Sequence, residues 1–178
     1  MIKTVFTFKE ILMESNKSIG NTARNVSYAI SAGNLYHIRR GLYAKDEYYN
    51  RQEMAVKIYK PAYISFETVL VEEGIIFQDY KTIMVASYKT VNIIADKQKI
   101  RYRKLKDELL VNAKGLIKNN FYYKASKERA VLDMLYLNKK YHFDNLQNMD
   151  WNMMFELVKI YKNKNLEIKL QQIYARSK

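Results

Sequence analysis

The sequence predicts an α+β protein in two parts: a small N-terminal unit of two helices and a β-hairpin, followed by a mixed α/β domain that ends in helices. Capped segments with helical periodicity alternate with short β-prone runs along the chain. The 178 residues, 48% of them hydrophobic, suffice for a module of roughly 50 residues joined to one of roughly 130. Because the charge changes sign at Lys45, we place the two domains at 1–45 and 46–178.

The first predicted helix begins at a capping box. The Thr7 hydroxyl can accept a hydrogen bond from the backbone N–H of Glu10, whose carboxylate can reach back to Thr7. The apolar spacing that follows predicts a short amphipathic helix to about Glu14. A polar turn over residues 15–20 then separates this helix from the next one.

The second predicted helix runs to about Ala32. Either Thr22 or Asn21 can cap its start, and Gly33 can end it in a left-handed conformation. Its apolar stripe contains Val26, so the opposite face is polar. That face carries Arg24, Tyr28 and Ser31 at i, i+4 and i+7, with Asn25 and Ser27 beside them.

A β-hairpin follows the second helix. Two β-prone runs, residues 35–38 and 42–44, flank the turn Arg39-Arg40-Gly41. A helix, a turn, a second helix and a hairpin tipped with two arginines together describe a winged helix-turn-helix. In that geometry the second helix enters the major groove of DNA and the hairpin lies along the backbone or the minor groove.

The charge distribution favours a surface that faces phosphates. The chain carries a formal net charge of +13, and no acidic residue lies between Asn16 and Lys45. We expect Arg24, Asn25 and Tyr28 to contact base edges. We expect the remaining polar side chains to position the duplex, namely Asn21, Thr22, Ser27, Ser31, Arg39 and Arg40.

Two simpler explanations compete with this one. An AT-rich genome enriches Lys, Asn and Tyr and would account for much of the bulk charge, although it would not remove every carboxylate from one stretch. The helix and hairpin could also be solvated parts of an ordinary α/β domain. A lone strand histidine such as His37 is more often a packed side chain than a ligand.

The second domain is predicted as a succession of helices and strands. A helix ends before Pro61, and another is capped by Ser65 and ends at Gly74. Strands are predicted at 82–86, 91–95 and 100–105, the last with a basic outer face, and two shorter strands at 116–117 and 121–124. Three helices complete the chain, at 127–137 with Ser126 as cap, at 151–161 and at 166–175.

Three ordered segments make the chain resemble the AbiEi family of bacterial antitoxins and transcriptional regulators. They are the wing of residues 38–43, the segment from Pro61 to Ile76, and the helix of residues 126–137, which together span roughly three quarters of the chain. The resemblance implies a winged-helix N-terminus that represses its own operon by binding inverted repeats. It also implies a C-terminal domain that antagonises a nucleotidyltransferase toxin, and it transfers no catalytic residues.

Several functional classes are excluded or disfavoured. The absence of cysteine excludes disulfides, thiolate metal sites and a thiol nucleophile. Phosphate-loop, zincin and nucleophile-elbow motifs are absent, so we expect no enzyme, no cofactor and no metal site. Charged residues come too early for a signal peptide, and no apolar run approaches the ~20 residues of a membrane span. We therefore expect a cytoplasmic protein with no membrane partner.

The sequence thus predicts a DNA-binding autorepressor that is the antitoxin of an AbiE-like pair, with double-stranded operator DNA and a nucleotidyltransferase toxin as partners. The alternative is a protein-binding module whose basic surfaces hold an acidic partner without specific DNA binding. RNA binding ranks below both, because no strand carries the aromatic signature of an RNA-recognition sheet.

Overall fold

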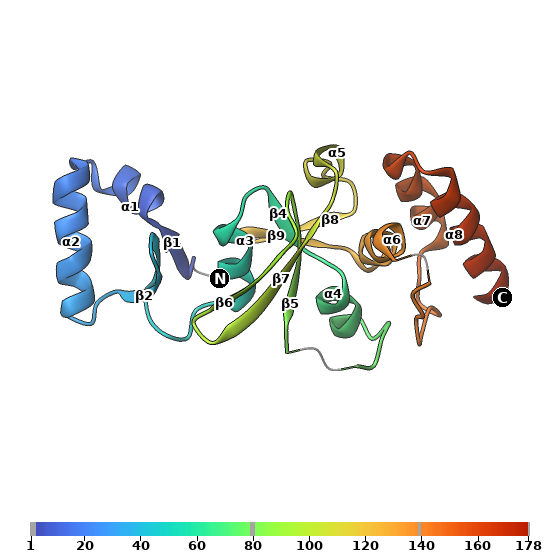
Figure 1. Cartoon of the computed structure of the whole chain (residues 1–178), viewed down its shortest axis with the longest axis horizontal. Helices are drawn as coiled ribbons and strands as arrows, with labels where there is room; N and C mark the ends of the chain where they lie inside the picture. The colour runs from blue at the N-terminus through green and yellow to red at the C-terminus, as the bar shows by residue number, and fades with distance from the viewer. Residues whose placement is uncertain (1–2, 79–80, 139, 178) are drawn as a thin grey trace.

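The computed structural model describes residues 3–78, 81–138 and 140–177. It has a mixed α+β fold, as the sequence predicts. The N-terminal unit lies at one end of an elongated molecule, the last helices lie at the other end, and a β-sheet stands between them (Figure 1).

The N-terminal unit combines two helices with a three-stranded antiparallel sheet. Its elements are β1 (Val5–Thr7), α1 (Phe8–Ser15), α2 (Ile19–Ser31), β2 (Tyr36–Arg39) and β3 (Leu42–Ala44). The strand order is β1-β3-β2. The hairpin is therefore confirmed, whereas β1 was not predicted because three residues are too few to show alternation.

The start of α1 is confirmed and the start of α2 is not. Thr7 and Glu10 form the reciprocal capping box. The cap of α2 is Ser18, whose hydroxyl accepts from the backbone N–H of Asn21, so the prediction of Thr22 or Asn21 as cap is wrong. Ser18 lies within the predicted polar turn. Because its hydroxyl caps the helix, α2 begins at Ile19, earlier than predicted. Gly33 follows the helix with a φ of +72° and takes the expected left-handed conformation.

The second domain is built on a six-stranded mixed sheet in the order β6-β7-β5-β4-β9-β8. The strands are β4 (Ala62–Ile64), β5 (Ile83–Ser87), β6 (Val91–Ala95), β7 (Gln98–Lys104), β8 (Leu116–Asn119) and β9 (Tyr122–Ala125). Five of these six strands correspond to predicted ones. The short β4 lies in the middle of the sheet and was missed.

Helices cover both sides of this sheet. They are α3 (Arg51–Ile58), α4 (Glu67–Glu72), α5 (Asp107–Leu110), α6 (Lys127–Leu137), α7 (Trp151–Leu157) with the 3-10 turn η1 (Val158–Tyr161), and α8 (Lys164–Ser177). Figure 1 shows α3 between the sheet and the N-terminal unit, and α6 on the other side with α7 and α8 beyond it. In the described part of the chain, no helix has the length and apolarity that a membrane crossing requires.

A buried polar network fixes α6 on the sheet. Arg129 and Asp133, four residues apart, form an ion pair of 3.3 Å in which both side chains are 0% exposed. Asp133 also accepts hydrogen bonds from Tyr63 at 2.9 Å and Tyr161 at 2.7 Å. The Ser65 hydroxyl donates to the same carboxylate at 2.8 Å. The prediction that Ser65 caps a helix is therefore wrong, because this hydroxyl belongs to the core network.

Candidate nucleic-acid interface

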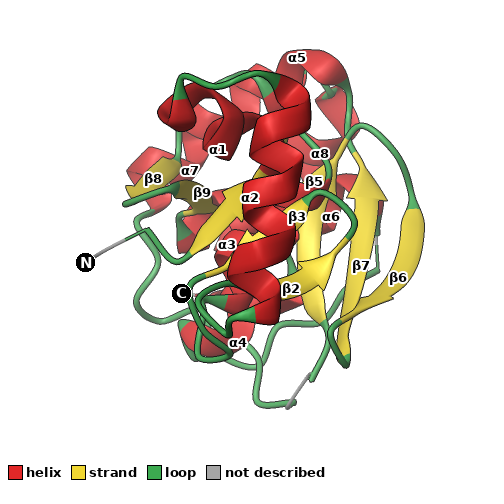
Figure 2. Ribbon diagram, turned by 90° about the vertical axis from the view of Figure 1, so that its left-hand side faces the viewer, coloured by secondary structure: helices red, strands yellow, loops and turns green. Residues whose placement is uncertain are grey.

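The helix α2 forms the outermost surface at the N-terminal end of the molecule. Viewed from that end, it crosses in front of the other elements (Figure 2). Its inner side is buried at Thr22 and Val26, which are 1% and 6% exposed. Because packing uses only this narrow stripe, most of the helix surface is open to a partner.

Four of the predicted contact residues share the outer face of α2. Arg24, Tyr28 and Ser31 are exposed at i, i+4 and i+7, and the exposed Asn21 lies one turn before Arg24. Tyr28 is 67% exposed although it is aromatic. No acidic residue occurs on the helix, so this face offers polar side chains and the single positive charge of Arg24 with no carboxylate beside them.

Asn25 lies at the edge of this face rather than at its centre. It is exposed, but it helps to line a shallow hollow of about 310 Å³ together with Glu14, Val26 and Ala29. The carboxylate of Glu14 is engaged by Lys3 at 3.5 Å. Asn25 therefore faces the side of α2 on which α1 lies, while Arg24 points outward.

Two of the predicted hydroxyl contacts are not available as expected. Thr22 is buried between α1 and α2, where its hydroxyl lies 3.0 Å from that of Ser15. Its assignment as a DNA contact is wrong, because a threonine can also serve as a packing residue on the inner side of a helix. Ser27 is exposed, but its hydroxyl donates to the backbone oxygen of Ala23 at 3.1 Å. It has no second proton to give to a phosphate.

The hairpin turn presents two exposed arginines. Gly41 has a φ of +76°, and its carbonyl accepts from the backbone N–H of Phe8 at 2.9 Å, which fixes the turn against the start of α1. Arg39 and Arg40 line a small hollow of about 140 Å³ beside the end of α3. Within the described part of the chain neither arginine has an ion pair, so both charges are uncompensated.

The two arginines are not equivalent. Burial raises the pKa of the Tyr102 hydroxyl, and the nearby positive charge of Arg39 acts in the opposite direction. The charge of Arg39 thus acts on a residue of the large sheet, although both arginines line the hollow beside α3. Among the described residues, no hydrogen bond connects either arginine with α2, so the hairpin and the helix contribute separate contact surfaces.

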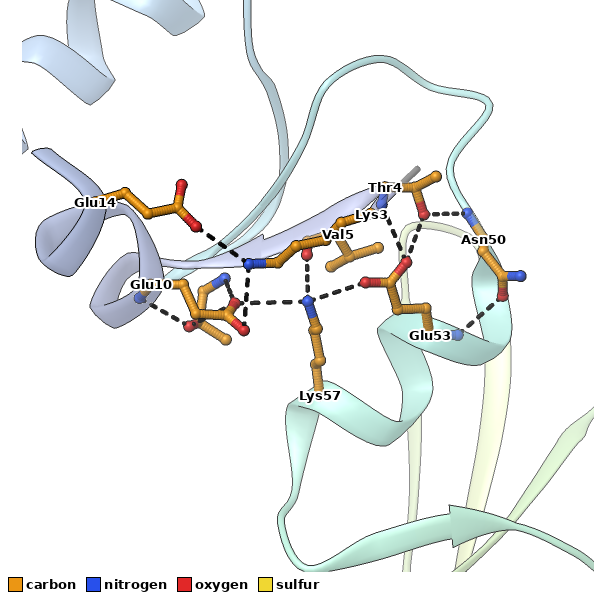
Figure 3. Close-up of polar contacts among 9 residues, drawn as sticks. Lys3, Thr4, Val5, Glu10, Glu14, Asn50, Glu53 and Lys57 are labelled. Carbon is orange, nitrogen blue, oxygen red and sulfur yellow. Dashed lines mark hydrogen bonds and ion pairs between the residues drawn. The ribbon is translucent and has the colours of Figure 1, made fainter. Parts of the chain in front are cut away.

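A cluster of charged residues, here called the junction cluster, joins the N-terminal unit to α3 (Figure 3). It contains Lys57, Glu10, Glu53, Lys3 and Thr4. The Lys57 side chain, 3% exposed, donates to the Val5 carbonyl and pairs with Glu53 at 2.9 Å and Glu10 at 3.5 Å. Glu53 also accepts from the backbone N–H and hydroxyl of Thr4 at 3.1 and 2.7 Å.

The junction cluster sets the charge state of Glu10. Burial alone would raise the pKa of this carboxyl, but hydrogen bonds from Thr7 and the positive charges of Lys57 and Lys3 lower it to about 2. Glu10 is consequently ionised while it caps α1 and holds Lys57. The capping box was readable from the sequence, whereas its pairing with Lys57, 47 positions later, was not.

A second set of polar contacts holds the hairpin against the large sheet. Asp96, in the turn between β6 and β7, accepts from the hydroxyls of Tyr36 at 3.1 Å and Tyr49 at 2.8 Å. Arg51 pairs with the same carboxylate at 2.6 Å. These partners lie 45 to 60 positions from Asp96 in the chain, so no local motif identifies them.

Comparison with known proteins assigns no family. Neither the known protein-family models nor the curated proteins match this chain. In the described part of the chain, no three His, Asp or Glu side chains form a group that could hold a metal ion. The geometry described above therefore carries the functional argument.

Proposed function

We propose that this protein is a sequence-specific DNA-binding repressor with a winged helix-turn-helix at its N-terminus, and that it acts as the antitoxin of an AbiE-like toxin–antitoxin pair. The observation that carries the DNA-binding part is the outer face of α2. It lies at the end of the molecule, is open along its length, and combines Arg24 and Tyr28 with no carboxylate (Figure 2).

The arrangement of the N-terminal elements supports this proposal. A strand, two helices and a hairpin follow one another, and the first strand pairs with the last strand of the hairpin. In a winged helix, the second helix of the helix-turn-helix enters the major groove, which is about 12 Å wide and admits one α-helix. The exposed turn at Arg40 then supplies charge to the DNA backbone.

The residues divide into two kinds of contact. Arg24 and Tyr28, with Asn25 at the edge, contact bases. Exposed groups around them position the duplex, namely Asn21, Ser31, Arg39 and Arg40. Thr22 supports the helix from its buried side, and Ser27 can only accept a hydrogen bond. Such a division predicts sequence specificity from a short stretch of one helix.

The antitoxin part of the proposal depends on the three ordered segments that resemble the AbiEi family. It identifies the target as an inverted repeat upstream of the protein's own operon and the functional partner as a nucleotidyltransferase toxin. The proposal expects the adjacent open reading frame to encode a nucleotidyltransferase. Coexpression with the product of that reading frame tests this part, because the intact protein should restore growth. Continued toxicity at equal expression would contradict the antitoxin assignment.

A gel-shift titration with the upstream DNA tests the DNA-binding part. Arg24→Ala should weaken operator binding by about 1–3 kcal/mol and affect random DNA much less, because a bidentate contact to a base is lost. Lys162→Ala is the matched control, since this exposed cation lies between η1 and α8, and α8 lies at the other end of the molecule from α2 (Figure 1). Equal losses on operator and random DNA would assign Arg24 to the phosphates instead.

The alternative is a module that binds an acidic protein through basic surfaces such as strand β7. This surface supports the alternative less well than α2 supports DNA binding, because its arginines already have partners. Arg103 on that strand is already engaged: it lies 3.6 Å from Glu67 and 4.8 Å from the centre of the Phe66 ring. Arg101 donates to Asn92 at 3.0 Å. Pull-down of a neighbour-encoded protein, with no DNA affinity at moderate salt, would favour this alternative.

A further inference from the structure

A hollow of about 530 Å³ opens between α8 and the loop that precedes α7. The helix α8, which lines it, lies at the opposite end of the molecule from α2 (Figure 1). Lys140 in the loop and Lys169 and Arg176 on α8 give it positive charge, and Tyr141, Phe143 and Ile173 give it an aromatic and aliphatic wall. Its volume falls within the ~300–1,000 Å³ of small-molecule sites.

The face of α8 that lines the hollow is set by the core. Leu166 and Leu170 are 4% and 0% exposed and anchor the helix. Lys169, Ile173 and Arg176 follow at i, i+4 and i+7 and therefore share one face. Since all three line the hollow, the two cations are held toward the loop by the packing of their own helix.

The positive charge of the hollow is uncompensated. In the described part of the chain, none of its three Lys and Arg side chains has an ion pair. The nearby carboxylate of Asp144 is used elsewhere: it accepts from the backbone N–H of Phe77 at 2.9 Å and lies 3.9 Å from His142. Burial, together with the charges of Arg176 and Lys140, lowers the pKa of Lys169.

The apolar wall narrows the choice of anion. Phe143 is 9% exposed, and its ring centre lies 5.1 Å from that of Tyr141. A free phosphate would leave this wall uncovered. A duplex bound to α2 would have to run the length of the molecule to reach the hollow (Figure 1). A ligand with both a polyanionic group and a flat apolar group would contact the cations as well as the aromatic and aliphatic wall.

We propose that this hollow binds a nucleoside phosphate. Its phosphates contact Lys140, Lys169 and Arg176, and its base packs against Tyr141, whose ring is supported by the buried Phe143. Lys and Arg are the usual phosphate partners in proteins, and aromatic rings stack on any base. The proposal is independent of DNA binding by α2, since it uses none of the same residues.

Isothermal titration calorimetry on the full chain tests the proposal, with ATP, adenosine and tripolyphosphate as separate probes. ATP should bind more tightly than adenosine or tripolyphosphate, because only ATP contacts both the cations and the aromatic wall. Lys169→Gln and Arg176→Gln should each weaken ATP binding at least tenfold, and the second variant keeps the test valid if the first does not fold. Lys162→Gln, a cation on an exposed turn that pairs with Glu108 at 3.6 Å, should bind ATP like the original protein.

The aromatic wall is tested separately. Tyr141→Leu should weaken the binding of ATP and leave the binding of tripolyphosphate unchanged. Equal binding of ATP and tripolyphosphate would overturn the nucleoside part of the proposal, and absence of ATP binding at millimolar concentration would overturn it entirely. If Lys169→Gln instead weakens operator DNA and not ATP, the hollow is a DNA contact and the proposal is wrong.

Discussion

The N-terminal unit and the rest of the chain are stabilised by different kinds of contact. In the second domain, a continuous apolar core encloses even the ion pair of Arg129 and Asp133. The N-terminal unit adds only a few residues to that core, among them Val5 and Leu42. Much of its attachment comes from the junction cluster and from Asp96.

Because of this difference, we expect that the stability of the protein and the placement of α2 can be changed separately. Apolar contacts respond little to pH or salt, whereas ion pairs near the surface respond to both. Variants in the core should unfold the chain, and variants in the junction cluster should loosen the N-terminal unit first.

Removal of the buried carboxylate in α6 should have the largest effect. Asp133→Ala leaves the Arg129 guanidinium uncompensated inside the core and removes the acceptor of three hydroxyls. Breaking one side of a buried ion pair costs about 3–5 kcal/mol. Urea unfolding followed by circular dichroism should show this loss, and Asp107→Ala, an exposed carboxylate, should show almost none. Equal small losses for both variants would contradict the importance of the network.

Removal of the central cation of the junction cluster should have an intermediate and local effect. Lys57→Met keeps the length of the side chain but leaves Glu53 and Glu10 without their shared partner. We expect a loss of about 2–3 kcal/mol. Hydrogen exchange should become faster in β1 and α1 and remain unchanged in α6. Lys60→Met, at an exposed position near the end of α3, is the control. A uniform increase over both domains would show that they unfold as one unit.

Acid should weaken the N-terminal unit through Glu10. Its pKa is about 2 in the folded protein against 4.5 for the unperturbed carboxyl, so the folded state binds its proton less readily than the unfolded state. The stabilisation is therefore complete above about pH 4.5 and is lost as the pH falls toward 2. After allowance for solvent screening, we expect about 1 kcal/mol.

Glu10→Gln isolates this effect. The variant should be less stable than the original chain at neutral pH, and the difference should shrink as the pH falls from 4.5 to 2. Thermal unfolding at several pH values measures it, with Glu14→Gln as the control, because that carboxylate is mostly exposed. A difference between the two chains that does not depend on pH would rule out the ionised form of Glu10 as the stabilising species.

The fold was largely predictable because most of its elements depend on local signals. The capping box at Thr7, the cap at Ser126, the left-handed Gly33 and the predicted strand at 91–95 are all confirmed. Apart from the cap of α2 at Ser18, the misses discussed above are short or non-local. The strands β1 and β4 have three residues each, and Ser65 is recruited by Asp133, 68 positions away.

The candidate interface was predictable only as a set of residue types. Helical spacing places Arg24, Tyr28 and Ser31 on one side of α2, and the structure keeps them exposed there. Spacing could not show that Thr22 lies on the buried side, because the direction of burial depends on where α1 packs. Nor could it show that the charge of Arg39 acts on Tyr102, since the two residues lie 63 positions apart in the chain.

The smallest predicted effect separates the two arginines of the hairpin. Each phosphate contact adds about 0.9 to the slope of log affinity against log salt concentration. Arg40→Ala should therefore flatten this slope for operator and random DNA alike, by about one contact. Arg39→Ala should flatten it by less, because the charge of Arg39 also acts on Tyr102 in the large sheet. Filter binding at several salt concentrations measures both slopes.

Equal slopes for the two variants would mean that the hairpin moves away from the large sheet when it binds DNA. That movement would require the contacts of Asp96 with Tyr36 and Tyr49 to break. Asp96→Asn would then change the slope of the Arg40 variant, which still carries Arg39, but not that of the Arg39 variant.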